Sequence, residues 1–113
     1  MQIAERLVGN VKILDLSGQI TLVKGDDQLL KDKVNSLVHQ GHKNILVNLA
    51  NVTHMDSAGL GELVGAYTTV AKAGGSMKLV NLTKRLHDLL SITKLLTVFD
   101  TYDSEKDALG TFS

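Results

Sequence analysis

Three chemically active residue types lie together in the stretch HMDSAGLG, residues 54–61. His54, Asp56 and Ser57 are the histidine, acid and nucleophile that a serine hydrolase needs. In such enzymes these residues come from separate parts of the chain, and the Gly-x-Ser-x-Gly turn of the α/β hydrolases is absent here. We therefore predict no catalytic residues in this chain.

The glycines in and after this stretch raise a second possibility, the binding of phosphate. Gly59, Gly61 and Gly65 are spaced Gly-x-Gly-x-x-x-Gly, whereas the dinucleotide fingerprint is Gly-x-Gly-x-x-Gly. Asn81 also occupies the place at which that fingerprint has an acidic ribose ligand. Free amides at a strand-to-helix turn can still hold an anion, so nucleotide or phosphate binding at the Gly-rich turn 57–61 is kept as an alternative.

Ser57 stands between an apolar run and a helical pattern, where a serine side chain often caps the helix. Gly59 and Gly61 lie in the first turn and Gly65 one turn later, and each costs up to about 1 kcal/mol relative to Ala. Either close packing within the protein or contact with a partner must offset this cost. Gly61 and Gly65 share one helix face, and both explanations stay open for it.

The composition limits the partners that the chain can bind. Lys plus Arg and Asp plus Glu number 12 each, so no bulk positive charge favours nucleic acid or an anionic membrane. With no Cys, the chain has no thiolate nucleophile, disulfide or thiolate metal site. His39 and His42 lie near a helix end without further ligands, and we predict no metal and no cofactor. No basic leader or membrane span is evident, so we expect a cytoplasmic protein.

Hydrophobic periodicity predicts a small α/β fold. A length of 113 residues suits a single domain, residues 1–113, with one core. Strands alternate with helices, which indicates a mixed central sheet of about five strands packed by three to four helices. The expected strands are QIAERLV and VKILDLSG, paired as a hairpin around Gly9-Asn10, then NILVNL, MKLVNL and LLTVFD.

Capping and stop residues mark the expected helix boundaries. The first helix is expected to be capped by Asp26 or Asp27 and to end at Gly41, and the second to run from Ala58 to Lys72 and stop at Gly74-Gly75. The third helix follows a cap at Thr83 and comprises KRLHDLLSI. The last helix runs from Ser104 to Leu109.

The second helix has one apolar stripe and one smooth side. The stripe is expected to face the sheet and consists of Leu60, Leu63, Val64 and Tyr67. The other side, with Gly61, Glu62 and Gly65, is then exposed and available to a partner.

The segment NILVNLANVTHMDSAGLGELVGAYTTVAKAGGSMKLVNL resembles the centre of the STAS family, the bacterial anti-sigma factor antagonists. In this family a strand ends in Asp-Ser, followed by Ser or Ala, Gly, Leu or Ile, and Gly. The likeness extends to LSGQIT early in the chain and to VFDTYDSEKDAL late in it. It covers nearly the whole chain, and MDSAGLG in this setting is a specific signal for the family.

The resemblance implies a protein that works by binding, with Ser57 as a phosphorylation site. In the family, the corresponding serine is phosphorylated by a partner that is both an anti-sigma factor and a serine kinase, and a serine phosphatase resets the cycle. The unphosphorylated antagonist binds this partner and frees the sigma factor. The expected partner-binding surface, bordered by residues 17–21, comprises Asp56, Ser57, Ala58, Gly59, Gly61, Glu62 and Gly65.

The physics of the position agrees with a switch at Ser57. A phosphate adds roughly two negative charges next to Asp56. Bulk and charge then weaken a close interface, while the helix amides can hold the phosphate without unfolding the chain. Three roles stay open for Asp56, which can orient Ser57, contact the partner or cap the turn.

Two positions depart from the family pattern. Lys94 stands where the family often has a glycine after its third helix, so this position needs another stop or a strained lysine. Ala58 stands where many relatives have a second serine, which leaves Ser57 as the only hydroxyl of the motif. Some family members serve in larger signalling assemblies, lipid trafficking or transporter regulation, so a STAS module in another assembly is a further alternative.

Overall fold

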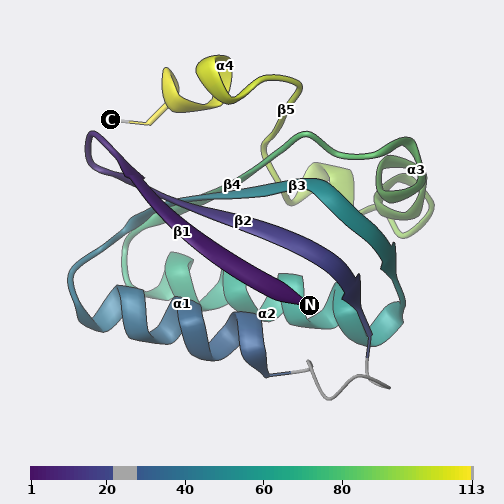
Figure 1. Cartoon of the computed structure of the whole chain (residues 1–113), viewed down its shortest axis with the longest axis horizontal. Helices are drawn as coiled ribbons and strands as arrows, with labels where there is room; N and C mark the ends of the chain where they lie inside the picture. The colour runs from purple at the N-terminus through teal and green to yellow at the C-terminus, as the bar shows by residue number, and fades with distance from the viewer. Residues whose placement is uncertain (22–27, 113) are drawn as a thin grey trace.

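A five-stranded sheet with the strand order β1-β2-β3-β4-β5 forms the centre of the protein (Figure 1). The computed structural model describes residues 1–21 and 28–112, and the helix cap predicted at Asp26 or Asp27 lies outside this part. β1 is antiparallel to β2, whereas the other neighbours are parallel, which confirms the predicted mixed sheet. The strands are β1 (Gln2–Val8), β2 (Val11–Ile20), β3 (Asn44–Met55), β4 (Ser76–Val80) and β5 (Thr101–Tyr102).

Helices connect the parallel strands, and their ends follow the predicted signals. Thr83 and Ser104 cap the last two, with hydroxyl oxygens that accept first-turn amides at 3.2 and 3.1 Å. Gly41 and Gly74 follow the first two in the left-handed region, with φ of 91° and 80°. The helices of the described chain are α1 (Leu29–His39), α2 (Ser57–Lys72), α3 (Lys84–Ile92) and α4 (Glu105–Leu109), with a 3-10 turn, η1 (Leu95–Thr97).

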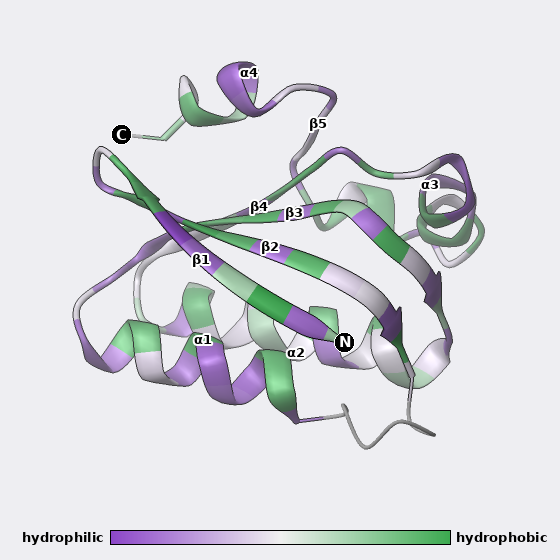
Figure 2. Cartoon of the chain, viewed as in Figure 1, coloured by the Kyte–Doolittle hydropathy of each residue, from purple (hydrophilic) through white to green (hydrophobic). Residues whose placement is uncertain are grey.

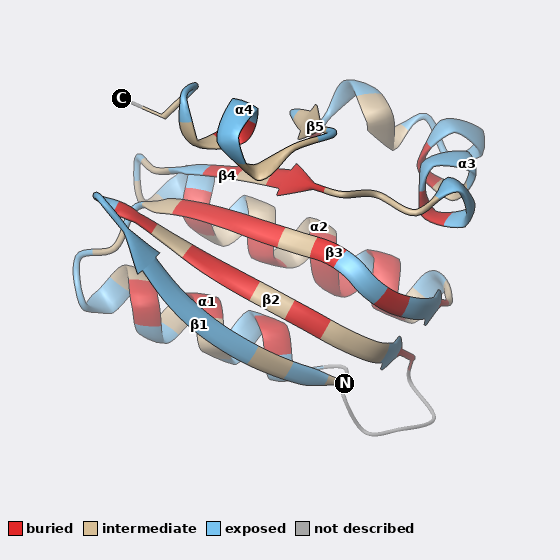
Figure 3. Cartoon of the chain, turned by 45° about the horizontal axis from the view of Figure 1, so that its top comes forward, coloured by how far each residue is buried: buried red, intermediate tan, exposed pale blue. Residues whose placement is uncertain are grey.

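α1 and α2 lie together on one face of the sheet and cover the main core (Figure 1). Figure 2 shows hydrophobic stretches along the central strands and hydrophobic patches on both helices. Figure 3 shows that the buried residues concentrate in the middle of β2 and β3 and on these two helices, whereas β1 is largely exposed. The predicted stripe of α2 is confirmed, because Leu60 and Leu63 are buried while Val64 and Tyr67 pack against the same core.

α4 covers part of the opposite face of the sheet, which we call the outer face. Five buried residues form a second, smaller core there: Val11, Ile13, Leu46, Val80 and Ala108. Leu46 thus faces this core while its neighbours Ile45 and Val47 face the main core. The prediction that NILVNL is a strand buried on both faces is confirmed.

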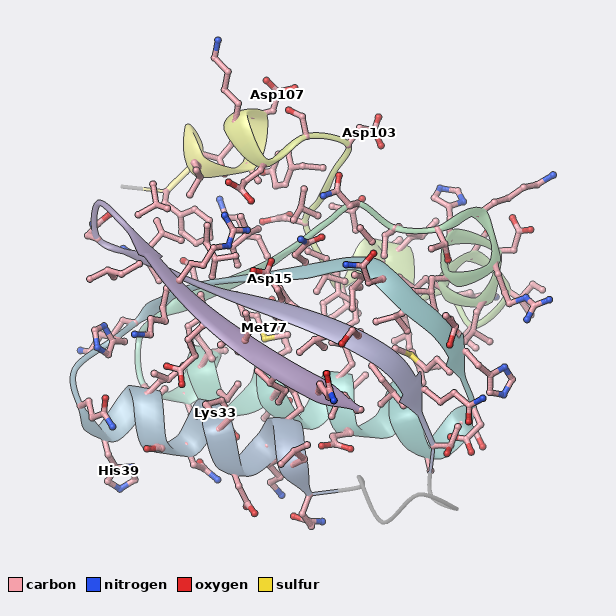
Figure 4. The ribbon with its side chains drawn as sticks, viewed as in Figure 1. Asp15, Lys33, His39, Met77, Asp103 and Asp107 are labelled. Atoms are coloured by element: carbon pink, nitrogen blue, oxygen red, sulfur yellow. The ribbon has the colours of Figure 1, made fainter. Side chains whose placement is uncertain are left out.

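A line of polar side chains crosses the outer face beside this smaller core. Arg6 pairs with Glu105 of α4 at 2.6 Å and with Asp15 at 2.6 Å, near the middle of the sheet (Figure 4). The amide of Asn48 donates to Asp15 at 2.8 Å, and that of Asn81 donates to Asn48 at 3.1 Å. The Arg6 guanidinium lowers the pKa of the Asp15 carboxyl, although partial burial acts in the opposite direction. The first strand and the last helix are therefore held to one another.

The prediction that LLTVFD forms the last strand is wrong. This segment contains η1, and the residues that pair with β4 are those of β5. Leu95 and Leu96 are adjacent and both pack against the core, and Phe99 is buried. A strand would turn adjacent side chains to opposite faces, so this packing needs a helical turn. Lys94 starts the turn with φ of 63°, which is the strained lysine that the departure from the family pattern implied.

Candidate partner-binding site

The long strand β3 carries the chain to the stretch that contains Ser57. β3 continues past the predicted NILVNL as far as Met55, because Val52 and Met55 are also buried in the main core. At its end Met55 pairs with Ile20 of β2, and the Asp56 amide donates to the Ile20 carbonyl oxygen at 3.4 Å. The end of β2, part of the predicted border at residues 17–21, therefore lies directly beside the turn.

Asp56, and not Ser57, caps α2. The backbone of Asp56 is extended, and its Oδ1 accepts a hydrogen bond from the Gly59 amide at 2.9 Å. The interpretation of Ser57 as the capping residue is wrong, because the aspartate one position earlier already fills that role. Ser57 is instead the first residue of the helix, and it is exposed. Within the described part of the chain, no residue makes a hydrogen bond with the Ser57 hydroxyl.

Gly59 allows α2 to approach the end of β2. The residue is buried, and a Cβ at this position would collide with the carbonyl oxygen of Ile20 and lie 2.9 Å from its carbonyl carbon. Backbone atoms cannot move aside as the tip of a side chain can, so the close approach requires glycine. The lower helix propensity of Gly59 is thus offset by this close packing of α2 against the end of β2.

Gly61 and Gly65 share a helix face but have different surroundings. Gly61 is exposed, and a Cβ there would meet no atom of the described residues within 4 Å. Gly65 is half-buried, and its Cβ would lie 4.0 Å from the Cδ atom of Lys31 on α1. This face of α2 is therefore open at Gly61, near Ser57, and is covered by the aliphatic stem of Lys31 at Gly65, one turn later. No contact within the described residues accounts for a glycine at position 61.

Glu62 is buried, with 6% of its surface exposed. The prediction that it lies on the exposed side of α2 is wrong, because its side chain turns toward the start of α1. Its Oε1 accepts a hydrogen bond from the Leu30 amide at 2.6 Å. Sequence reasoning missed this link, since hydrophobic periodicity along α2 does not say where α1 packs.

The candidate surface is therefore smaller than the predicted set. Ser57 and Gly61 are exposed, and Asp56, Ala58 and Gly65 are partly exposed. They lie on one end and one side of α2, where a rigid sheet and a capped helix hold them in place. The arrangement therefore presents the Ser57 hydroxyl to solvent, next to a helix surface that has no side chain at Gly61.

The described residues around this surface do not form a metal site. Among the described residues, no three His, Cys, Asp or Glu side chains lie close enough together to hold a metal ion. His39 projects from the end of α1 into solvent (Figure 4), and its Nδ1 lies 2.8 Å from the carbonyl oxygen of Asn35. None of the described helices combines the length and the apolar character needed to cross a membrane.

Comparison with known protein families gives one match over most of the chain. Residues 2–108 match the STAS domain. The anti-sigma-B factor antagonist of Bacillus subtilis is 38% identical over 87 residues, which are 77% of each chain. The anti-sigma F factor antagonist of Paenibacillus polymyxa is 29% identical over 100 residues, 88% of this chain and 84% of that one.

Solved structures share the fold. A Thermotoga maritima protein assigned as an anti-sigma factor antagonist superposes with a TM-score of 0.87 and 25% identity, over 96% of this chain and 92% of that one. The anti-sigma factor antagonist SpoIIAA in its unphosphorylated form has a TM-score of 0.72 and 18% identity, over 96% of each chain. SpoIIAA in its phosphorylated form has a TM-score of 0.73.

Proposed function

The chain belongs to the STAS domain family, and on this premise we propose that it is an anti-sigma factor antagonist that acts in the cytoplasm by binding a protein. The relatives from Bacillus subtilis and Paenibacillus polymyxa carry this name. In the proposal, the unphosphorylated chain binds an anti-sigma factor with serine kinase activity and frees the sigma factor. Phosphorylation of Ser57 ends the binding, a serine phosphatase restores it, and the chain has no catalytic activity of its own.

The observation that carries the proposal is the division of roles between Asp56 and Ser57. Asp56 supplies the helix cap through the Gly59 amide, so the turn does not depend on the Ser57 hydroxyl. Ser57 is exposed at the start of α2, where a kinase can reach it without unfolding the chain. A modification there alters the surface and leaves the supporting hydrogen bonds intact.

A phosphate on Ser57 would change this surface strongly. It brings roughly two negative charges at neutral pH, next to the Asp56 carboxylate. Because Gly61 leaves the neighbouring helix surface smooth, a partner can approach closely there, and such an interface tolerates little added bulk. We therefore expect the phosphate to weaken association while the fold persists. SpoIIAA keeps its fold in both forms, with TM-scores to this chain of 0.72 and 0.73.

The proposed partner-binding surface follows from exposure. It comprises Asp56, Ser57, Ala58, Gly61 and Gly65, all at least partly exposed on α2 or its cap. Gly59 and Glu62 do not face the partner in this proposal, since both are buried. They support the surface from within.

The alternative of a nucleotide or phosphate ligand at residues 57–61 is less favoured. An anion would need the amides of the first turn, but the Gly59 amide is already bound to the Asp56 carboxylate. That carboxylate also repels a second negative group. A STAS module in another assembly is the competing function, and the experiment below separates it from the proposal.

The test is to incubate the chain with the anti-sigma kinase encoded in the same genome and with ATP. We expect a mass gain of one phosphate in the wild type and none in Ser57→Ala, with kinase binding lost after modification. Thr68→Ala, which removes another exposed hydroxyl of α2, serves as the matched control and should behave as wild type. If the wild type neither gains mass nor binds the kinase, the protein serves another STAS assembly.

A further inference from the structure

We infer that Asn48 is a positioning residue for the Ser57 turn, because its side chain fixes the direction in which the end of β3 leaves the sheet. This role deepens the proposed function and rests on it for the importance of Ser57. Asn48 belongs to the polar line on the outer face and precedes Ser57 by nine positions, so it acts through the backbone of β3.

The Ser57 turn stands at the end of a two-stranded ribbon. β1 pairs with β2 only as far as Ser17, and β4 pairs with β3 only as far as Asn48. Beyond these rows, residues 17–20 of β2 and 51–55 of β3 pair with each other, and within the described chain no further strand pairs with that part of β3. The position of Ser57 therefore depends on the direction in which this ribbon leaves the sheet.

β3 bends where the ribbon begins. Asn48 of β3 pairs with Asp15 of β2, and the next pair of the ladder joins Asn51 to Ser17. β3 thus advances three positions while β2 advances two, which makes this a β-bulge. A bulge bends the strand that carries the extra residue. Figure 1 shows β3 running along the sheet and then turning toward the start of α2.

The side chain of Asn48 holds this bulge through three hydrogen bonds. Its Oδ1 accepts from the amide of Ala50, a bulge residue that pairs with no residue of the described ladders, at 3.1 Å. The same oxygen accepts from the Asn81 side chain at 3.1 Å, and its Nδ2 donates to the Asp15 carboxylate at 2.8 Å. Because Asp15 belongs to β2 and Asn81 directly follows β4, these bonds tie the bulge to the strands on both sides.

Asparagine has the chemistry that this position needs, since one amide group both accepts and donates. An aspartate would still accept from Ala50 and Asn81, but it would set a second carboxylate against Asp15. Arg6 holds the Asp15 carboxylate with two further hydrogen bonds, at 2.6 and 2.9 Å. The acceptor for the Asn48 amide is therefore itself anchored, and the polar line braces the root of the ribbon.

The first test needs no partner and measures the distance between two spin labels on either side of the bend. The chain has no Cys, so Lys43→Cys and His54→Cys, both at exposed residues, give a single labelled pair. His54 lies up to about 20 Å along the strand from Asn48, so a change of about 10° in the bend moves the label by about 3 Å. We expect Asn48→Ala to broaden the distance distribution or to shift its mean by at least about 1 Å. An unchanged distribution overturns the inference.

A swap of two side chains separates positioning from general damage. Asn48→Asp should also disturb the distance, because two carboxylates then face each other. Asp15→Asn combined with Asn48→Asp restores a donor and an acceptor across the pair and should recover most of the wild-type distribution. Val11→Ala removes buried atoms from the smaller core at the other end of β2, and it is the control that lowers stability alone. If Val11→Ala disturbs the distance as much as Asn48→Ala does, the positioning role is refuted.

The second test measures the kinetics with which the anti-sigma kinase phosphorylates Ser57. A misplacement of about 1 Å can cost about a hundredfold in rate, so we expect Asn48→Ala to lower kcat/KM at least about tenfold. The side-chain swap should recover most of this loss, and Val11→Ala should change kcat/KM less than about twofold, since it is distant from the ribbon.

The two tests fail in different ways. If Asn48→Ala alters the distance but is phosphorylated as rapidly as wild type, the bend does not position Ser57 and the inference alone is overturned. A wild type that the kinase neither binds nor phosphorylates overturns the proposed function, while the spin labels still decide whether Asn48 sets the bend.

Discussion

Gly59 and Gly61 are two positions apart in α2, and the structure predicts opposite effects of the same substitution. At Gly61 an added methyl group would meet nothing within 4 Å in the part of the chain that the structure describes. At Gly59 it would meet the carbonyl group of Ile20, with the carbon atom at 2.9 Å. The pair Gly59→Ala and Gly61→Ala therefore isolates the packing of α2 on the end of β2.

The magnitudes follow from two competing contributions. Alanine stabilises a helix by up to about 1 kcal/mol relative to glycine, so Gly61→Ala should raise the free energy of unfolding by about 0.5–1 kcal/mol. Gly59→Ala has the same gain, but overpacking against backbone atoms typically costs about 1–3 kcal/mol. Its upper range applies here because Ile20 is held in the sheet, and we expect a net loss of about 1–2 kcal/mol. The two variants should thus differ by roughly 2–3 kcal/mol.

The assay is thermal denaturation followed by far-ultraviolet circular dichroism, since the chain has no Trp. At about 4 °C per kcal/mol for a domain of this size, the expected shifts in Tm are roughly +2 to +4 °C for Gly61→Ala and −4 to −8 °C for Gly59→Ala. Folded Gly59→Ala should bind the kinase as tightly as wild type, whereas Gly61→Ala should bind it more weakly. Equal destabilisation by both substitutions would refute the placement of α2 against Ile20.

Three further predictions concern other parts of the structure. Asp56→Ala should lower the free energy of unfolding by about 1 kcal/mol, with most of it regained in Asp56→Ser, as measured by denaturation. Lys94→Gly should raise it by about 1 kcal/mol by removing the left-handed strain, whereas Lys94→Ala should give no such gain. Because Arg6 lowers the pKa of Asp15 in the folded state, this carboxylate stabilises the protein above about pH 4 and loses that contribution as the pH falls. Asp15→Asn should therefore flatten the fall in stability below pH 4, and an unchanged acid profile would contradict the assignment.

Elements with strong periodicity could be predicted from the sequence, and contacts between elements could not. The stripe of α2 and the stops at Gly41 and Gly74 depend on neighbours along the chain, and these predictions are confirmed. LLTVFD has the composition of a strand, but Leu95 and Leu96 both face the core. Tertiary packing therefore overrides the propensity of that segment.

The candidate site shows the same limit at the level of single residues. The motif located the turn, yet Asp56 and Ser57 both suit a helix cap, and only the geometry assigns that role to the aspartate. Glu62 is polar and lies between glycines on a helix, so sequence reasoning placed it at the surface. Its burial depends on the free amide of Leu30, which belongs to a helix that starts 33 residues earlier than Glu62.

The polar line on the outer face also has a consequence for synthesis of the chain. Arg6 and Glu105 are separated by 99 positions, and Ala108 completes the smaller core that Val11 and Ile13 begin. A ribosome adds about 5–20 residues per second, so Val11 and Ile13 are translated roughly 5–20 s before the Ala108 side chain that buries them. Throughout that interval the nascent chain presents an apolar patch that other chains can bind. Burial of this patch therefore has to wait until Ala108 of α4 has been translated.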